Sequence, residues 1–418
     1  MTTRMPSQFI LLILAVLAIV STARSDKKSL QPPQQDYYRI CPLPRCERCP
    51  TIEELQAPGI GFALEMGHGT AVVRHHNGTY QSIALIKGDS AYKEVMYRFV
   101  TDPKPRTPTE YTNTWSETWA LFWWLLKRHI NKLVGLPATP DTAILASMLS
   151  ALREATEASV DGKYPINSGI LSVPDHLKFA EAETNDIFDY LKLENLMMRS
   201  PSVFEKAHLP AASAAYRGYG KGLCKNYLDS YRCEEEEWYF PSKNILHVDL
   251  GIESFSGTII DFKDGQSTIT VEGSFVDFNL GYQEEKADEI YWKAIGERIR
   301  EMVSSTKRRI DIDELVLSGP SANTSGLRVA LREALHDMVE EEVLFSLNEV
   351  DDATLADGHW TNTYTFATAR GAAEIAKRRQ EGPVNCMQTD ECKELRRQVH
   401  DGTLPKERMT RYGHRQGL

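Results

Sequence analysis

Hydrophobic and polar positions along the chain predict two groups of strands, each followed by helices. In the first group, residues 60–86, short apolar runs flank Asn77-Gly78, a dipeptide that favours a tight hairpin turn. The second group is the hairpin of residues 247–271, HVDLGIESFSGTIIDFKDGQSTITV, whose first strand ends in Asp-Leu-Gly. The second half of the chain is therefore predicted to restart with strands, as the first half does.

Two long helices are predicted after the first strands. Residues 115–133, WSETWALFWWLLKRHINKL, are rich in Trp, Phe and Leu, which would suit a ligand-stacking face or a helix on a membrane surface. We favour an amphipathic helix buried against the protein body, since aromatic stripes at helical spacing usually belong to a core. Thr139 and Pro140, as cap and first-turn proline, begin a second helix. Its apolar face holds Ile144, Leu145, Met148, Leu149 and Leu152.

After these helices, the sequence predicts several shorter elements. Residues 169–177, GILSVPDHL, predict a buried strand that runs into a turn, and residues 208–220, HLPAASAAYRGYG, predict an alanine-rich helix that another element can approach closely. Residues 227–242 are acidic and predict a solvated loop. A strand at 315–317 leads through a glycine turn at Gly319 into a further helix.

Composition narrows the class of protein. The chain has 418 residues, of which 42% are hydrophobic and 25% are charged, as in an ordinary globular protein. Its net charge of −10 argues against a nucleic-acid partner. No serine-hydrolase elbow is present, because the segment GIESFSG lacks the Gly-x-Ser-x-Gly pattern.

The N-terminus predicts a secretory protein. Residues 9–20, FILLILAVLAIV, follow a basic residue and precede small residues, so residues 1–24 are interpreted as a cleaved signal peptide. An uncleaved anchor is the alternative, and only then would the protein be attached to a membrane through this segment. In both cases the folded part faces the endoplasmic reticulum lumen or the exterior. Sequons at Asn77 and Asn323 are then candidate glycosylation sites.

The seven cysteines fit an oxidising compartment. We expect two short-loop disulfides, Cys224 with Cys233 and Cys386 with Cys392. The other three lie in the proline-, glutamine- and charge-rich linker of residues 25–58, where one bridge and one unpaired or intermolecular thiol are expected. They have no fourth ligand at zinc spacing, so no metal site is predicted. These three are Cys41, Cys46 and Cys49.

Five segments together resemble the nucleotide-binding domain of Hsp70 chaperones, within the actin-like ATPase superfamily. They are LEMGHGTAVV, SGILSVPDHL, LPAASAAYRGYG, HVDLGIESFSGTIIDF with VLSGPSANTSGLRVAL, and ATARGAAEIA. Each is weak alone, but their order and spacing over residues 59–377 are more specific. The family's peptide-binding domain has no counterpart here, so a complete peptide-clamping chaperone is not expected.

The resemblance implies an α/β, two-lobed, RNase H-like fold in which each lobe is a mixed sheet flanked by helices. The first lobe would span residues 59–246, the second 247–385, and a charged tail 386–418. ATP or ADP with Mg²⁺ is the cofactor that the resemblance implies, in the cleft between the lobes; otherwise none is expected. Phosphoryl transfer there depends on acidic groups that position water and metal.

The family's first phosphate motif, Asp-Leu-Gly-Thr-Thr, can be matched in two registers. One places Glu65 at the acid and Gly67 at the glycine; the other, shifted by two, places Ala63 at the acid and Glu65 at the glycine. We favour the first, because Gly67 and Gly69 can supply a turn, but both registers stay open. The implied nucleotide contacts are Gly67, His68, Gly69 and Thr70.

The second phosphate motif is kept in part. Asp249, Gly251 and Ser254 match it, while Ile252 and Glu253 replace glycines. If Glu253 faced a bound phosphate, its charge would repel that phosphate. Side chains of a strand alternate between its two faces, so Glu253 could equally point away, and both directions stay open.

Other motifs depart further from the family. The glutamate that begins the family's central helix is replaced by Leu209, which can neither bind water nor take a proton. The adenosine motif becomes Gly319-Pro320-Ser321, in which proline removes a backbone donor; Gly319 and Ser321 are the implied nucleotide contacts, and Asn323 follows at the cleft edge. No lysine matches the family's phosphate-side lysine with confidence, and Lys127 and Lys132 are candidates by proximity alone.

Two functional hypotheses follow. The favoured one is a secreted or lumenal interaction module with a degenerate cleft, an unknown protein partner, and weak or no ATPase activity. The alternative is a working chaperone-like ATPase with a modified site, in which Asp249 and Glu65 are the best catalytic candidates. A sugar kinase of the same fold has little support. His68, His75, His76 and His247 have no paired nucleophile or metal spacing and are interpreted as packing or surface residues.

Overall fold

The computed structural model describes residues 45–46, 48–102, 114–160, 166–199, 206–262, 270–306, 311–347, 359–383 and 386–403. The chain divides into two compact units, Met1–Pro44 and Arg45–Leu418, and every described residue belongs to the second unit. The predicted signal or anchor, most of the predicted linker with Cys41, and the end of the predicted tail lie outside the described residues.

The first sheet is mixed. The antiparallel strands β1, β2 and β3 are followed by β4 parallel to β1, in the order β3-β2-β1-β4-β5, and β6 also pairs with β4. The predicted turn at Asn77-Gly78 joins β2 to β3, and Gly78 adopts a positive φ of 85° there. The strands are β1 Gly59–Leu64, β2 His68–Arg74, β3 Tyr80–Lys87, β4 Ser168–Val173, β5 Glu194–Asn195 and β6 Leu209–Pro210.

The second sheet repeats the connectivity of the first. Its order is β10-β7-β8-β9: β7, β8 and β9 are antiparallel neighbours, and β10 runs parallel to β7 as β4 does to β1. The predicted restart with strands is therefore confirmed. The strands are β7 Lys243–Leu250, β8 Phe255–Phe262, β9 Thr270–Asp277 and β10 Glu314–Ser318.

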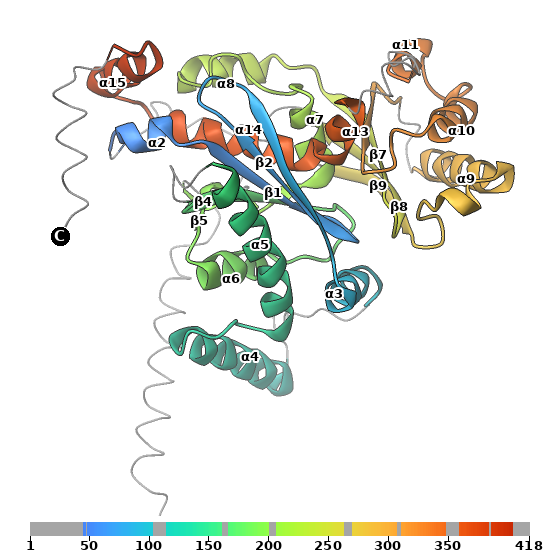
Figure 1. The fold of residues 1–418 in the computed structure, drawn as a ribbon, viewed down its shortest axis with the longest axis horizontal. Helices are drawn as coiled ribbons and strands as arrows, with labels where there is room; N and C mark the ends of the chain where they lie inside the picture. Colours follow the sequence, from blue (N-terminus) through green and yellow to red (C-terminus); the bar gives the residue numbers. More distant parts are fainter. Residues whose placement is uncertain are drawn as a thin grey trace, which may run out of the picture. The chain divides into compact units, whose positions relative to one another are not determined.

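Helices cover both sheets, so the fold is α/β with two mixed sheets, each with its own hydrophobic core (Figure 1). Thr139 caps the helix that Pro140 begins, and the predicted apolar face of that helix packs into the first core. The main helices are α2 Ile52–Gln56, α3 Ser90–Thr101, α4 Trp115–Leu133, α5 Pro140–Ser159, α6 Glu181–Leu191, α7 Ala211–Gly218, α8 Ser230–Trp238, α9 Glu289–Ser305, α10 Ser325–Leu335, α11 Glu341–Phe345, α13 His359–Thr365, α14 Ala367–Glu381 and α15 Asp390–His400. The described residues also contain two short 3₁₀ helices, η1 Leu196–Met198 and η2 Glu284–Lys286.

Helices α7 and α14 join the two sheets. α14 lies along β1 and β2 of the first sheet, while α7 packs on β8 and β10 of the second, and the two helices pack against each other (Figure 1). Their contact is very close: a Cβ on Gly371 would lie 1.8 Å from the carbonyl oxygen of Ala214. The alanine-rich segment thus allows the close approach that its composition predicts.

Two disulfides connect the beginning of the described chain to its end. Cys46 pairs with Cys386, and Cys49 pairs with Cys392, so the predicted Cys386–Cys392 disulfide is wrong. Proximity in sequence misled the prediction, because the partners lie 340 and 343 residues apart. The Cys224–Cys233 disulfide is confirmed. Three disulfides are consistent with an oxidising, secretory-type environment.

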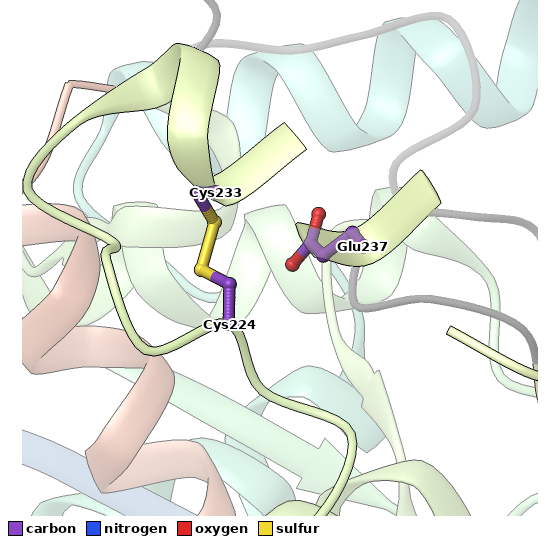
Figure 2. A group of neighbouring side chains, drawn as sticks. All are labelled: Cys224, Cys233 and Glu237. Atoms are coloured by element: carbon purple, nitrogen blue, oxygen red, sulfur yellow. A yellow bond between two sulfur atoms is a disulfide. The ribbon is translucent and has the colours of Figure 1, made fainter. Parts of the chain in front are cut away.

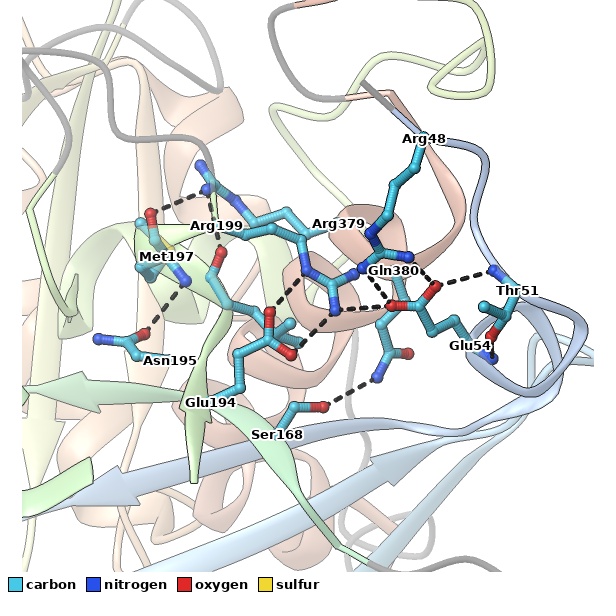
Figure 3. Close-up of polar contacts among 11 residues, drawn as sticks. Arg48, Thr51, Glu54, Ser168, Glu194, Asn195, Met197, Arg199, Arg379 and Gln380 are labelled. Carbon is cyan, nitrogen blue, oxygen red and sulfur yellow. Dashed lines mark hydrogen bonds and ion pairs between the residues drawn. The ribbon is translucent and has the colours of Figure 1, made fainter. Parts of the chain in front are cut away.

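Polar contacts reinforce this junction. Arg48 and Arg199 both bind Glu54 of α2, and Arg199 also binds Glu194 of β5 (Figure 3). Burial opposes the charge of Glu54, yet hydrogen bonds from Arg48 and Thr51 lower the pKa of Glu54 to about 2. The C-terminal part of the predicted linker is therefore a structured segment of the fold.

Two sequence predictions about local structure are wrong. Residues 227–242 contain helix α8 rather than a loop, because Asp229 caps its N-terminus through the backbone amides of Tyr231 and Arg232. Helix α4 is not buried: all of its side chains are at least partly exposed, and it lies beyond α6, away from both sheets (Figure 1). Among the described residues, no helix is both long and apolar enough to cross a membrane.

Candidate functional site

A cavity of about 340 Å³ opens between residues of the two sheets. Its volume is in the range of small-molecule sites, roughly 300–1,000 Å³. β1 ends just before Glu65, and Asp249 is the penultimate residue of β7, so the central strand of each sheet contributes one carboxyl group. The predicted site residues that line it are Glu65, Gly67, His68, Asp249, Gly251 and Ser254.

Glu65 and Asp249 both have raised pKa values. Burial raises the pKa of Glu65 well above its ordinary value, and the charge of Asp249 raises it further. Burial also raises the pKa of Asp249. Each carboxyl accepts one hydroxyl hydrogen bond that favours its charged form: Thr368 donates to Glu65 at 2.9 Å, and Ser318 donates to Asp249 at 2.6 Å.

The position of Glu65 bears on the two registers of the first phosphate motif. Glu65 lines the cavity, and a tight turn through Met66 and Gly67 returns the chain to β2, closed by the Glu65 amide donating to the His68 carbonyl. Ala63 instead packs beneath α14, and a Cβ on Gly69 would contact side chains of α5. The structure thus places Glu65 at the cavity and Ala63 in the core.

A third carboxyl group, which the sequence analysis did not identify, lies near these two. Asp175 follows β4 and accepts a hydrogen bond of 2.8 Å from the backbone amide of Ala212 in the first turn of α7. Burial raises the pKa of Asp175 to about 6. Its charge contributes to the raised pKa of Glu65. The feature of the sequence that could have identified Asp175 is an acidic residue just after a predicted buried strand, in the segment SVPDHL.

Glu253 occupies the part of the cavity nearest Gly67. A Cβ on Gly67 would lie 2.3 Å from Cγ of Glu253, so the glutamate side chain covers the bare backbone of this turn. Its Oε1 accepts a hydrogen bond of 2.5 Å from Nζ of Lys93 on α3. The question that the sequence left open is answered: Glu253 points into the cavity.

The turn after β7 also uses its own backbone donors. The Gly251 amide donates to the Ser254 carbonyl at 3.0 Å, and the Tyr282 amide donates to the Gly251 carbonyl at 2.9 Å. An amide that is already paired inside its turn cannot also bind a phosphate oxygen well. Ile252 extends from this turn and is half exposed.

Other positions from the resemblance lie apart from the cavity. Leu209 packs into an apolar cluster with Ile170, Ala214 and Ala372. Lys132 pairs with Asp186 and Asp189 on α6, so neither Lys127 nor Lys132 of α4 belongs to the cavity. The lysines that line it are Lys87 and Lys93.

The glycine turn after β10 meets the cavity only through Pro320. Gly319 has a φ of 101° and donates its amide to the Tyr364 carbonyl, while the buried Ser321 donates its amide to the Leu250 carbonyl. Asn323 accepts a hydrogen bond from Arg328 at 3.1 Å. This turn fastens β10 to β7 and α13, and its donors are already occupied.

His247, Ser318 and Asp249 form a buried chain of hydrogen bonds. Nε2 of His247 lies 2.8 Å from Oγ of Ser318, which in turn donates to Asp249. Burial and the charge of His176 lower the pKa of His247 to about 3, so the imidazole is neutral. The serine lies between histidine and aspartate and is itself buried, which is not the order of a hydrolase triad.

One cluster of side chains of the types that bind metals lies outside the cavity. In the described ranges, one group of three such side chains has its ligand atoms within 4.8 Å of one another: Cys224, Cys233 and Glu237 (Figure 2). The two cysteines form a disulfide, so their sulfurs are not thiolate ligands.

Comparisons with known proteins do not assign the chain to a family. No protein-family model matches the chain, and no curated protein matches its sequence.

Proposed function

We propose that the chain is an Hsp70-like member of the actin-like ATPase superfamily. The repeated strand order of the two sheets supports this, as do the paired helices α7 and α14 between them. The cavity opens where the central strands of both sheets end, which is where the resemblance implies a nucleotide cleft. The three disulfides favour a protein that is secreted or resident in the endoplasmic reticulum lumen.

Within this fold, the protein acts as an interaction module that does not turn over ATP efficiently. One observation carries this proposal: Glu253 places a carboxylate over the turn at Gly67 and pairs it with Lys93. The side chain thus occupies the place of an anionic ligand and uses a lysine that could have bound one. A phosphate entering the cavity would have to displace it.

Two further features support the proposal that the protein does not hydrolyse ATP efficiently. Leu209 takes the place of a water-binding glutamate and packs among apolar side chains. The Gly251 amide is paired within its own turn. With Glu253 and Lys93 paired inside the cavity, the surface of the protein is left as the means of interaction with a partner protein.

The test is a calorimetric titration of the glycosylated protein with Mg-ATP and Mg-ADP. We expect weak binding of Mg-ATP and little or no ATP turnover for the wild type. Glu253→Ala should bind Mg-ATP roughly tenfold more tightly than the wild type, since it removes the carboxylate and frees Lys93. The matched control, Glu272→Ala on exposed β9, should behave as the wild type does.

Mg²⁺-dependent hydrolysis by the wild type that Asp249→Asn abolishes would overturn the proposal. That outcome would establish the alternative, a working ATPase with a modified site. One observation favours this alternative: Glu65 and Asp249 both reach a cavity that also contains Lys87, so charged groups of both signs are in place.

A further inference from the structure

Helix α4 is attached to the protein by its charged face. Arg128 binds one carboxylate oxygen of Asp186 through Nε at 2.9 Å and Nη2 at 2.5 Å. Lys132 binds the other oxygen of Asp186 at 2.6 Å and Oδ2 of Asp189 at 2.8 Å. Both acids belong to α6, and Asp186 is fully buried, so this contact fixes which side of α4 faces the body.

The opposite face of α4 is apolar and faces outward. At 100° per residue, Arg128 lies half a turn away from a stripe without a charged residue. Trp115 is 82% exposed, Trp123 60% and Leu133 71%. The stripe consists of Trp115, Trp119, Phe122, Trp123, Leu126, Ile130 and Leu133.

This orientation is the reverse of that of an ordinary surface helix, which buries its apolar face and exposes its charges. The aromatic rings are also ordered among themselves. Trp119 stacks with Trp123 at a centroid distance of 6.5 Å, and Phe122 meets both rings edge-on at 5.6 and 5.5 Å. Beyond the helix, Val134 and Leu136 extend the exposed apolar surface. A contiguous patch of this kind indicates a binding surface.

We propose that α4 lies in the interface of a lipid bilayer, with its tryptophan stripe inserted and its charged face against the protein. Tryptophan favours the level of the lipid headgroups, where the ring is in apolar surroundings and its N–H can still bond. The helix is amphipathic and does not qualify as a membrane-spanning helix. This inference is independent of the cleft and of its nucleotide chemistry.

The charges beside the stripe suit lipid headgroups. Lys127 and His129 lie on its two flanks, and the one acid of α4, Glu117, lies on the opposite side. In an antiparallel symmetric pair, the Lys127 side chains of both copies would lie on the same side of the contact, and this like charge disfavours a second copy as the occupant. Arg128 and Lys132 are already neutralised, so insertion of aromatic rings is the main contribution and the salt dependence is weak.

Under the anchor alternative, in which the N-terminal apolar run is retained, a second segment of the chain would also hold the protein at a membrane. Residues 9–20 are an apolar run, and about 24 residues separate this run from the described fold. At roughly 3.4 Å per extended residue, that length can bridge about 80 Å. Stable attachment to a membrane usually takes two signals, and α4 supplies one that does not depend on whether the N-terminal run is retained.

The test is flotation of the full chain with vesicles of phosphatidylcholine and phosphatidylserine, and with phosphatidylcholine alone. We expect the wild type to float with both. The triple variant Trp115→Ser, Trp119→Ser, Trp123→Ser should partition roughly tenfold or more weakly. The matched control is Trp238→Ser with Tyr239→Ser, two exposed aromatics at the C-terminal end of α8, and it should float like the wild type.

Two further readouts separate the outcomes. Four of the seven tryptophans lie in α4, so vesicles should shift the wild-type fluorescence to the blue and should not shift that of the triple variant. Unfolding curves should be alike, since the changed residues are exposed. The proposal is overturned if the wild type stays in the supernatant. It is also overturned if the triple variant floats equally well, or if light scattering without lipid finds a wild-type dimer that the triple variant does not form.

Discussion

At the scale of single residues, three carboxyl groups whose pKa values are raised by burial lie at the cavity or beside it. Glu65, Asp175 and Asp249 come from three separate strand ends, and the charges of Asp249 and Asp175 both raise the pKa of Glu65. Two of the three could be predicted from the sequence, because Asp-Leu-Gly and a turn with glycines resemble phosphate motifs. Asp175 could not, since its importance depends on the helix that begins beside it.

Asp175 gives the protein a pH dependence of stability that can be measured. Burial raises its folded-state pKa to about 6 from an ordinary 3.8. The folded protein therefore holds this proton more tightly than the unfolded chain, so its contribution to stability is fully present below pH 3.8 and is lost as the pH rises through 6. Asp175→Asn should thus be more stable than the wild type at pH 8, by on the order of 1–3 kcal/mol.

Urea unfolding at pH 4, 6 and 8 checks this expectation. Asp390→Asn, a change at an exposed aspartate of α15, is the control and should follow the wild type at every pH. A wild type and Asp175→Asn with parallel pH profiles would show that Asp175 is not held in its protonated form by the fold.

At the scale of elements, the contact between α7 and α14 depends on residues without bulk. The Gly371 site leaves no room for a Cβ. Gly61 on β1 lies under α14 in the same way, because a Cβ there would lie 2.1 Å from the Ala369 carbonyl oxygen. Helix α4 illustrates the opposite case. The spacing of its apolar residues predicted the helix correctly. The direction in which its apolar face points depends instead on Asp186, a residue of another helix.

Gly371→Ala should destabilise the protein by roughly 2–4 kcal/mol, because the added methyl group meets backbone atoms of α7 that cannot rotate away. Thermal unfolding measures the loss. Gly273→Ala in β9 is the matched control, since its Cβ would have ordinary contacts of 3.7 Å and longer. If both variants melt at the same temperature, the two helices are less closely packed than the structure indicates.

At the scale of the whole molecule, the ends of the described chain hold each other. Cys46 and Cys49 bind the segment before α2 to Cys386 and Cys392 around α15, and Leu55 packs against Val399. Nζ of the buried Lys377 donates to the carbonyl oxygens of Leu55 and Ala57 at 2.7 Å each. The fold therefore includes segments whose composition is that of a linker and a tail.

The double variant Cys46→Ser with Cys49→Ser should lose about 2–5 kcal/mol of stability, because the two bridges restrain a loop of more than three hundred residues. Limited proteolysis should then cut first next to α2 and α15. The comparison variant, Cys224→Ser with Cys233→Ser, opens a loop of only nine residues and should leave both helices protected. Equal cleavage of α15 in both variants would contradict the expectation.

The sequence by itself determined the longer strands, helices α4, α5, α7 and α10, the restart with strands in the second half and the two acidic strand ends. These follow from the spacing of apolar residues, caps and glycines, which are local properties of the chain. Only the tertiary structure decided the partners of the distant cysteines, the direction of Glu253, the role of Asp175 and the outward face of α4. Each of these depends on contacts between residues far apart in sequence, and the pattern of one segment contains no information about the segment that packs against it.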